Sequence, residues 1–379
     1  MDVLAVEATR RLQVSRSLLE CKSGLGQSKE PDRLLWLAGL RGLLEVDRAV
    51  LVRQTITKRG RDLAARLRLS TLDMRTLQAR EASIAWVPER FAHVDGAACL
   101  AAEKRVDVQL KGLAWLPSSL IAFLRFDALI ARPHQILGAL TTLGEVASTK
   151  GTLPEPTDVV VAGHALVDLL IAACEDARHL DQVGRLELEA RVMRGHMTGD
   201  PDDQHTLEVI ASANKLMRYY LEQVHQAYVD SGITRRDVDV PDLGSVVAAP
   251  APWVGRYADL VEALRNNGRI AADILQTAEL ACFDALAGDT NYQARAFDHL
   301  FTPEHRQMLR LAVRVLREVS GPAIADRLGG LNDLDFERSA PAVPDRQVPA
   351  KATATAATEA TAEGSVLPAP EPEQLTTDN

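Results

Sequence analysis

The chain has 379 residues, of which 46% are hydrophobic and 25% charged, and a net charge of −9 at pH 7. This is ordinary globular composition, and the length allows two or more domains with a substantial core. Aromatic residues make up only 4%, while Ala, Leu and Arg are abundant, which favours packed helices over sheets rich in aromatic and β-branched residues. The composition therefore predicts an all-α protein.

Charge, cysteine usage and the N-terminal residues indicate where the protein works. Residues 1–95 carry 17 basic and 12 acidic side chains, a net charge of +5, which leaves −14 for the remainder. The four cysteines, Cys21, Cys99, Cys174 and Cys282, lie far apart and form neither a CxxC pair nor a zinc-finger spacing, so we expect reduced, mostly buried thiols. The first residues lack the pattern of a secretory signal, and no apolar run reaches the length of a membrane span. We therefore expect a cytoplasmic protein that contacts no membrane.

The first 95 residues predict a basic helical region. Residues 2–21 place apolar side chains at Val3, Val6, Leu12 and Leu18, which predicts an amphipathic helix. Residues 32–56 follow Pro31 and carry a long leucine-rich face, which predicts a second helix packed on the first.

Residues 57–80 are rich in basic residues and have the spacing of a helix-turn-helix. Apolar or small residues match the motif at Ala64, Leu69, Met74 and Leu77, but Arg68 stands where the motif usually has Gly. This predicts a DNA-binding surface, the alternative being a plain basic hairpin of helices. The residues expected to bind nucleic acid are Lys58, Arg59, Arg61, Arg66, Arg68, Thr71 and Arg75.

Residues 96–232 predict a central helical bundle. Helices are expected at 96–112, where alternating valines also suggest a strand, after Pro117, after Pro133, and near 186–193. The most apolar segment is residues 157–180, which predicts a buried central helix. Acidic residues at 200–203 then begin a long helix over 204–232, expected to lie alongside the central helix.

The central helix carries one polar stripe that suggests a metal site. His164 and Asp168 form one pair at helical spacing, and Glu175 and His179 form another about 10 Å away by helical rise. Imidazoles and carboxylates are the ligands of zinc, iron and manganese. The long helix would complete such a site with Glu222 and His225. The alternatives are a solvent-facing edge or buried hydrogen bonding, and no cofactor can be named.

The remaining segments are a linker, a second helical group and a tail. Residues 233–255 are rich in Pro and predict a linker, and residues 256–337 predict a C-terminal helical region with a helix that starts at Thr302-Pro303. Residues 338–379 hold six of the eighteen prolines and no aromatic residue, which predicts a disordered tail. The expected fold is thus a multi-helix bundle in two helical groups with a disordered C-terminal tail.

These patterns favour a binding protein over an enzyme. The chain contains no P-loop, no GxGxxG after a strand, no HExxH and no GxSxG motif. We therefore expect a helical interaction or scaffold protein that acts through a protein partner or through self-association. The alternatives are a DNA-binding protein that uses residues 57–80 and a metal-dependent enzyme with its site in the central bundle.

Overall fold

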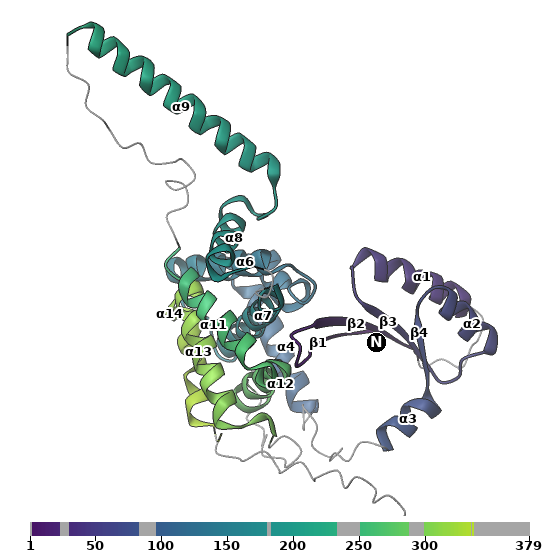
Figure 1. Cartoon of the computed structure of the whole chain (residues 1–379). Helices are drawn as coiled ribbons and strands as arrows, with labels where there is room; N and C mark the ends of the chain where they lie inside the picture. The colour runs from purple at the N-terminus through teal and green to yellow at the C-terminus, as the bar shows by residue number, and fades with distance from the viewer. Residues whose placement is uncertain are drawn as a thin grey trace, which may run out of the picture. The chain divides into compact units, whose positions relative to one another are not determined.

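The computed structural model describes residues 2–22, 30–82, 96–179, 183–232, 251–287, 299–334 and 336. Residues 1–340 form one compact unit, and the predicted disordered tail, 338–379, lies outside the described residues. The described chain is mostly helical, but it begins with a four-stranded sheet (Figure 1). The prediction of an all-α fold is therefore wrong for the N-terminal part.

The sheet combines one hairpin with two parallel crossovers. Strands β1 (Asp2–Ala8) and β2 (Val14–Lys22) are antiparallel, and β2 pairs in parallel with β3 (Arg48–Arg53), which pairs in parallel with β4 (Ser70–Asp73). Helix α1 (Glu30–Leu43) joins β2 to β3, and α2 (Lys58–Arg66) joins β3 to β4. The strand order is β1-β2-β3-β4, and α3 (Met74–Ala82) follows the last strand.

The helix predicted for residues 2–21 is instead the β1–β2 hairpin. Its turn is held by the hydroxyl of Thr9, which accepts from the Gln13 amide, and by the Leu12 amide, which donates to the Thr9 carbonyl. Leu12 has a left-handed backbone with φ of 60°. Glycine or asparagine usually takes this conformation, so a leucine there gives no turn signal in the sequence.

The helix predicted for residues 32–56 also ends early. The helix α1 stops at Leu43, Glu45 turns the chain with φ of 51°, and the apolar run of β3 becomes a central strand. A continuous apolar run is typical of a parallel strand covered on both faces. A small core lies beneath the strands and is formed by Leu18, Leu34, Leu37, Val46, Ala49, Leu51, Ala64 and Leu69.

The helix-turn-helix predicted for residues 57–80 does not form. The first helix is present as α2, and Arg68 does turn the chain in a left-handed conformation, with φ of 56°. After that turn, however, residues 70–73 hydrogen-bond to β3 as a strand, and the next helix begins only at Met74. A β-α-β unit therefore replaces the predicted motif.

The helices predicted over residues 96–232 and 256–337 are present. They are α4 (Gly96–Gly112), α5 (Ser118–Ala122), the π-helix η2 (Phe123–Asp127), α6 (Pro133–Lys150), α7 (Thr157–His179), α8 (Arg185–Thr198) and α9 (Gln204–Asp230), followed by α11 (Val254–Asn266), α12 (Gly268–Glu279), the π-helix η3 (Leu280–Ala287), α13 (Pro303–Ser320), α14 (Pro322–Ala325) and the 3-10 helix η5 (Asp326–Asp333).

Helix α7 is the centre of a single large core. It packs against α6, α11, α12 and α13, so helices from both predicted groups share one interior, which corrects the division into two groups. Gly163 permits close packing there, since a Cβ atom would lie 3.0 Å from Cys282 and from the ring of Phe283. The helix is long and apolar enough to cross a membrane, but most of that stretch is buried inside the protein.

The predicted burial of the cysteines is confirmed for two of them. Cys174 and Cys282 are fully buried free thiols, and burial raises the pKa of each to about 12. Cys21 is half-buried, and the side chain of Cys99 lies outside the described residues.

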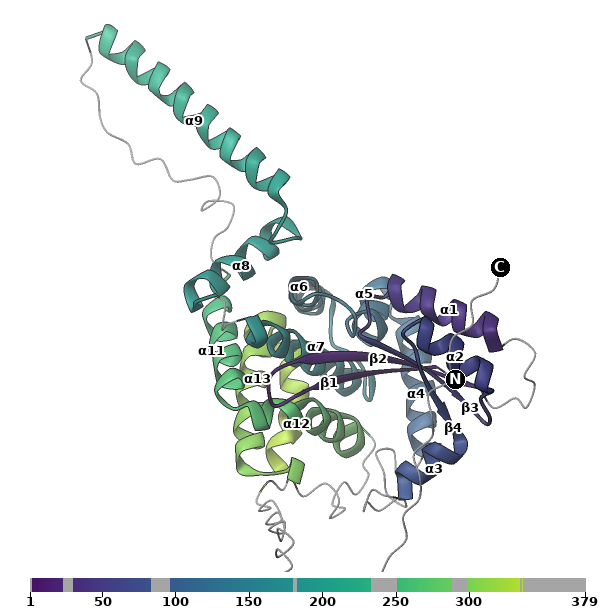
Figure 2. The same ribbon diagram turned by 45° about the vertical axis from the view of Figure 1, so that its right-hand side comes forward.

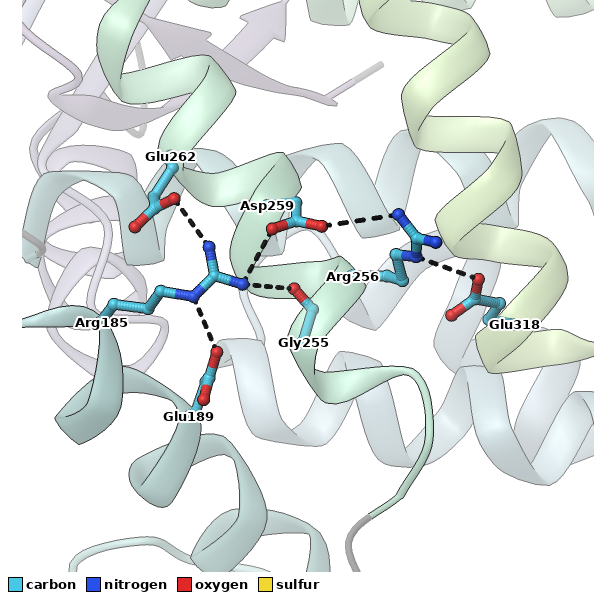
Figure 3. A network of polar contacts seen from close by, with 7 residues as sticks. All are labelled: Arg185, Glu189, Gly255, Arg256, Asp259, Glu262 and Glu318. Atoms are coloured by element: carbon cyan, nitrogen blue, oxygen red, sulfur yellow. Dashed lines mark hydrogen bonds and ion pairs between the residues drawn. The ribbon is translucent and has the colours of Figure 1, made fainter.

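Arg185 links α8 to α11 through ion pairs and a hydrogen bond at the surface of the helical region. Its guanidinium contacts the carboxylates of Glu189, Glu262 and Asp259 at 2.8–2.9 Å and donates to the Gly255 carbonyl at 3.1 Å (Figure 3). Arg256 continues the network from Asp259, at 3.8 Å, to Glu318 of α13, at 3.7 Å.

The hairpin end of the sheet is attached to the helical region. Strand β1 contacts α12 and β2 contacts α7 (Figure 2). Arg16 of β2 donates to the Leu129 carbonyl at 2.7 Å and pairs with Glu175 of α7 at 2.8 Å. Gly268, at the start of α12, lies against the carbonyl of Arg10, where any Cβ atom would collide.

Candidate functional site

The first predicted metal pair consists of His164, which is half-buried, and Asp168, which is buried in the large core. The His164 ring lies 4.8 Å from that of Phe283, and burial, aided by the charge of Arg125, lowers its pKa to about 4. Asp168 is 1% exposed, and burial raises the pKa of its carboxyl well above the ordinary value. Its Oδ2 has no hydrogen-bond partner among the described residues. Asp168 is thus a buried acid in the large apolar core, where burial favours its neutral form.

The second predicted pair lines a surface cavity. Glu175 and His179 border a space of about 220 Å³, but the Glu175 carboxylate is already paired with Arg16. The neighbouring Asp176 accepts a hydrogen bond from the Tyr257 hydroxyl at 2.7 Å, and burial raises its pKa to about 6 against the effect of that bond.

The residues expected to complete the metal site lie elsewhere. Glu222 and His225 are on α9, and α9 is not among the elements that pack on α7, so the predicted placement of these helices side by side is wrong. Within the described part of the chain, no group of three His, Cys, Asp or Glu side chains could hold a metal ion. The six predicted residues are therefore not brought together.

The residues predicted to bind nucleic acid are divided between two edges of the sheet. Lys58, Arg59 and Arg61 are in the first turns of α2, directly after β3, and Arg75 is in the first turn of α3, directly after β4. Arg66 and Arg68 precede β4 and so lie toward the opposite edge, while Thr71 is within β4. All six basic side chains are exposed.

Strands β2, β3 and β4 are parallel, so their carboxyl ends share one edge of the sheet, where ligands commonly bind in open sheets with parallel strands. Lys22 is the register partner of Arg53, and Arg53 is the register partner of Asp73. Two residues before Lys22, and therefore on the same face of β2, is Glu20. This edge thus gathers charged residues from three strands.

Glu20 is the unusual residue of this edge. It is 1% exposed, yet neither carboxylate oxygen has a hydrogen-bond partner among the described residues. Its neighbours are two cations, the Lys22 ammonium at 3.4 Å and the Arg33 guanidinium at 3.6 Å. A buried carboxylate is costly unless it is paired and hydrogen-bonded or coordinates a metal.

A second acid lies opposite Glu20 in the sheet. The register of the hairpin pairs Asp2 of β1 with Glu20 of β2. Residues that are directly opposite in a sheet share a face. The backbone register thus places a second acidic residue opposite Glu20.

The edge is fixed by a polar contact between three elements. Glu30, at the start of α1, accepts from the Thr57 hydroxyl at 2.7 Å and lies 3.7 Å from the Arg53 guanidinium. Thr57 in turn caps α2 by accepting from the Gly60 amide at 2.9 Å. A side chain at position 60 would collide with Glu30, which explains the glycine.

Sequence reasoning missed Asp2, Glu20 and Lys22 because it treated residues 2–21 as helical. At 100° per residue Glu20 and Lys22 point about 200° apart, whereas on a strand they share a face. The available signal was the spacing Glu-x-Lys at the end of an apolar strand.

No protein-family model, curated protein or solved structure matches this chain. The chemistry of the edge is therefore inferred from its own residues.

Proposed function

We propose that the carboxyl edge of the sheet binds a divalent cation and cleaves phosphodiester bonds in nucleic acid. The observation that supports this proposal is the buried Glu20 carboxylate, which has no hydrogen-bond partner among the described residues and has Asp2 as its register partner and Lys22 beside it. Mg²⁺ is commonly held through one or two carboxylates together with substrate phosphates, so two acids suffice.

Each residue has a distinct role in the proposed reaction. A divalent cation bound at Glu20, opposite Asp2 in the strand register, would polarise a phosphoryl oxygen and lower the pKa of a bound water. Lys22 stabilises the negative charge that grows on the phosphate oxygens. A water oxygen forms a bond to phosphorus, the ester P–O bond breaks, and the leaving oxygen takes up a proton from solvent while the attacking water loses one.

Exposed basic residues at the same edge supply the contacts to nucleic acid. Lys58, Arg59 and Arg75 follow the carboxyl ends of β3 and β4 and would bind backbone phosphates. Arg61 is already engaged, since it donates to the Ile56 carbonyl at 3.1 Å and lies 3.9 Å from Asp73. Nucleic-acid binding is thus retained as a proposal, but through a sheet edge and not through a helix-turn-helix.

A cleavage assay tests the proposal with the full chain. Single-stranded and double-stranded DNA and RNA are incubated with the protein and Mg²⁺ or Mn²⁺, with chelator as a blank. Glu20→Gln and Lys22→Met should each lower the rate on the order of 100-fold or more. The control Glu7→Gln changes an exposed acid of β1 and should leave the rate unchanged.

Two results would overturn the proposal. One is a wild-type chain that cleaves none of these substrates with either metal; the other is a Glu20→Gln variant that keeps full activity. Circular dichroism of each variant confirms folding, so that lost activity is not mistaken for lost structure.

We propose protein binding through α9 as a second function, because this helix exposes many apolar side chains. Val209, Leu216, Tyr220, Val224 and Tyr228 are each 49–61% exposed. Among the described residues, no other helix or strand packs extensively against α9. Contiguous exposed apolar surface commonly marks an interaction site. This is the function expected from the sequence, now assigned to one helix.

A stability measurement tests whether the face is available. The variant with Met217→Glu and Tyr220→Glu should keep its helical circular dichroism and unfold within a few degrees of wild type, because the fold does not rest on this face. At a concentration where the wild-type chain is monomeric, a loss of stability of several kcal/mol would instead mean that the chain covers the face itself, which contradicts this function.

A further inference from the structure

We propose that α9 pairs in antiparallel orientation with the α9 helix of a second copy of this chain. The inference rests on the second proposed function, binding through α9, and names its partner.

The apolar residues of α9 follow a heptad pattern. Positions that alternate in steps of four and three residues form one seam along the helix: Thr206, Ile210, Ala213, Met217, Tyr220, Val224 and Ala227. Each of these side chains is half-buried or exposed, so none is enclosed by the described chain. A repeat of 3.5 residues over three heptads is the pattern by which two helices pack along their length.

Residues beside the seam are also suited to a helix partner. Val209 and Leu216 border it on one side, and Leu221 and Tyr228 border it on the other. The acidic and basic residues between Glu208 and Glu222 lie outside the seam and its borders. Pairing of two identical faces therefore brings no like charges together, which would otherwise oppose self-association.

The sizes of the seam residues select the antiparallel orientation. In this orientation, with residues 207–230 of the two helices overlapped, Ile210 meets the second copy's Ala227, Met217 meets its Tyr220, and Val224 meets its Ala213. Two of these three layers join a large side chain with an alanine and so fill the space evenly. Parallel pairing would place alanine on alanine and tyrosine on tyrosine, which leaves some layers empty and others crowded.

The charges at the helix ends favour the same orientation. Apart from the N-cap, α9 has no acidic residue in its first turn and no basic residue in its last, and Asp230 lies at its C-terminus, where its own dipole disfavours a carboxylate. In the antiparallel pair Asp230 lies next to the positive N-terminal turn of the second copy. Parallel pairing would place the two Asp230 carboxylates together at the negative ends.

The length of α9 is sufficient for a stable contact. Its 27 residues span about 40 Å at 1.5 Å per residue. The seam and its borders supply eleven side chains from each copy, in one contiguous stripe.

Light scattering on the full chain measures the association. The wild-type protein should elute with twice the 41.2 kDa chain mass at about 50 µM, a typical concentration for such measurements, and dissociate on dilution. Tyr220→Glu, within the seam, should weaken dimerisation at least about 100-fold, because it places a charge at a packed position. Tyr219→Glu is the matched control: Tyr219 is adjacent and equally exposed but lies outside the seam, and its variant should dimerise like wild type.

Engineered cysteines test the orientation. A mixture of Ala213→Cys and Val224→Cys proteins should form a disulfide-linked heterodimer under mild oxidation, while either variant alone should not. Crosslinking of Ala213→Cys with itself would mean parallel pairing and would overturn the proposed geometry. The parent chain, with its four native cysteines, provides the background.

Three outcomes would overturn the proposal as a whole. They are a wild-type chain that stays monomeric at 100 µM, a dimer unaffected by Tyr220→Glu, and equal weakening by Tyr219→Glu. If the chain is monomeric while the seam variant retains full stability, α9 still stands as a binding face, but for a partner other than itself. If stability falls instead, the second proposed function fails as well.

Discussion

Glu20 in the sheet and Asp168 in the helical region are equally buried, at 1% exposure, but their surroundings differ. Glu20 lies at the edge of a sheet with two cations within 3.6 Å. Asp168 lies mid-helix in the large apolar core, and burial raises the pKa of its carboxyl. A buried acid can be stabilised by neighbouring cations or by a proton. Of the two acids, Glu20 is the one with cationic partners among the described ion pairs.

Truncation of a buried leucine should cost more stability in the large core around α7 than in the small core beneath the sheet. Leu169→Ala removes a fully buried side chain from α7, which is packed on several sides and cannot collapse, so we expect a loss of about 3–5 kcal/mol. Leu51→Ala in the small core beneath the sheet should cost about 2–3 kcal/mol. Chemical unfolding followed by circular dichroism measures both; equal losses would remove the distinction.

The acids of α7 should make stability fall as pH rises. Burial raises the pKa of Asp176 to about 6, above its ordinary 3.8, so the folded state holds the proton more tightly than the unfolded state. The stabilisation that the protonated Asp176 gives to the folded state is complete below about pH 4 and is lost as the pH rises to about 6. Between pH 4 and pH 7 the unfolding free energy should therefore fall less in Asp176→Asn than in wild type, by at most about 3 kcal/mol.

A control separates this titration from general charge effects. Asp202 lines the same cavity but is exposed, so Asp202→Asn should leave the pH dependence unchanged. An Asp176→Asn variant with the slope of wild type would mean that Asp176 ionises normally.

Divalent cations should distinguish the two buried acids directly. At ten times the dissociation constant, Mg²⁺ should stabilise the wild-type chain by about 1.4 kcal/mol. Glu20→Gln should abolish this stabilisation, whereas Asp168→Asn should retain it. Thermal unfolding with and without Mg²⁺ measures the shift. Loss of the shift in Asp168→Asn would mean that the cation binds in the helical region and not at the sheet edge.

The smallest effect is expected at the surface of the helical region. Arg185→Gln removes a guanidinium that contacts three carboxylates and one carbonyl, so we expect a loss of about 1 kcal/mol, limited by its exposure. Arg194→Gln removes a single exposed pair with Glu187 and should cost less than about 0.5 kcal/mol. Urea unfolding compares the two variants, and equal losses would show that the network adds nothing to isolated pairs.

Most helices could be predicted from the sequence because their signals are local. Proline and acidic residues indicate the starts of α6, α9 and α13, and apolar periodicity indicates their lengths. The sheet could not be predicted in this way, because Leu12, Glu45 and Arg68 turn the chain in left-handed conformations where glycine is usual. The β3 run was short and apolar and so resembled a buried helix.

Prediction of the candidate site depended on the same choice between helix and strand for the N-terminal residues. Glu20 and Lys22 share a face only if residues 14–22 are a strand, and Asp2 meets Glu20 only if the hairpin forms. The central helix at 157–179 was predicted with nearly correct bounds, but its polar residues proved to be separate features. That α9 does not pack along α7 depends on tertiary contacts that periodicity does not encode.

The attachment of the hairpin to the helices determines how this chain can be divided. Ala8, Leu12 and Val14 belong to the large core and not to the small one beneath the sheet. A fragment of residues 1–95 would keep the strands that carry Glu20 and Lys22 but expose these apolar side chains to water, and Arg16 would lose its contacts with Leu129 and Glu175. Such a fragment should aggregate on expression, and the carboxyl edge of the sheet should be studied only with its helical neighbour attached.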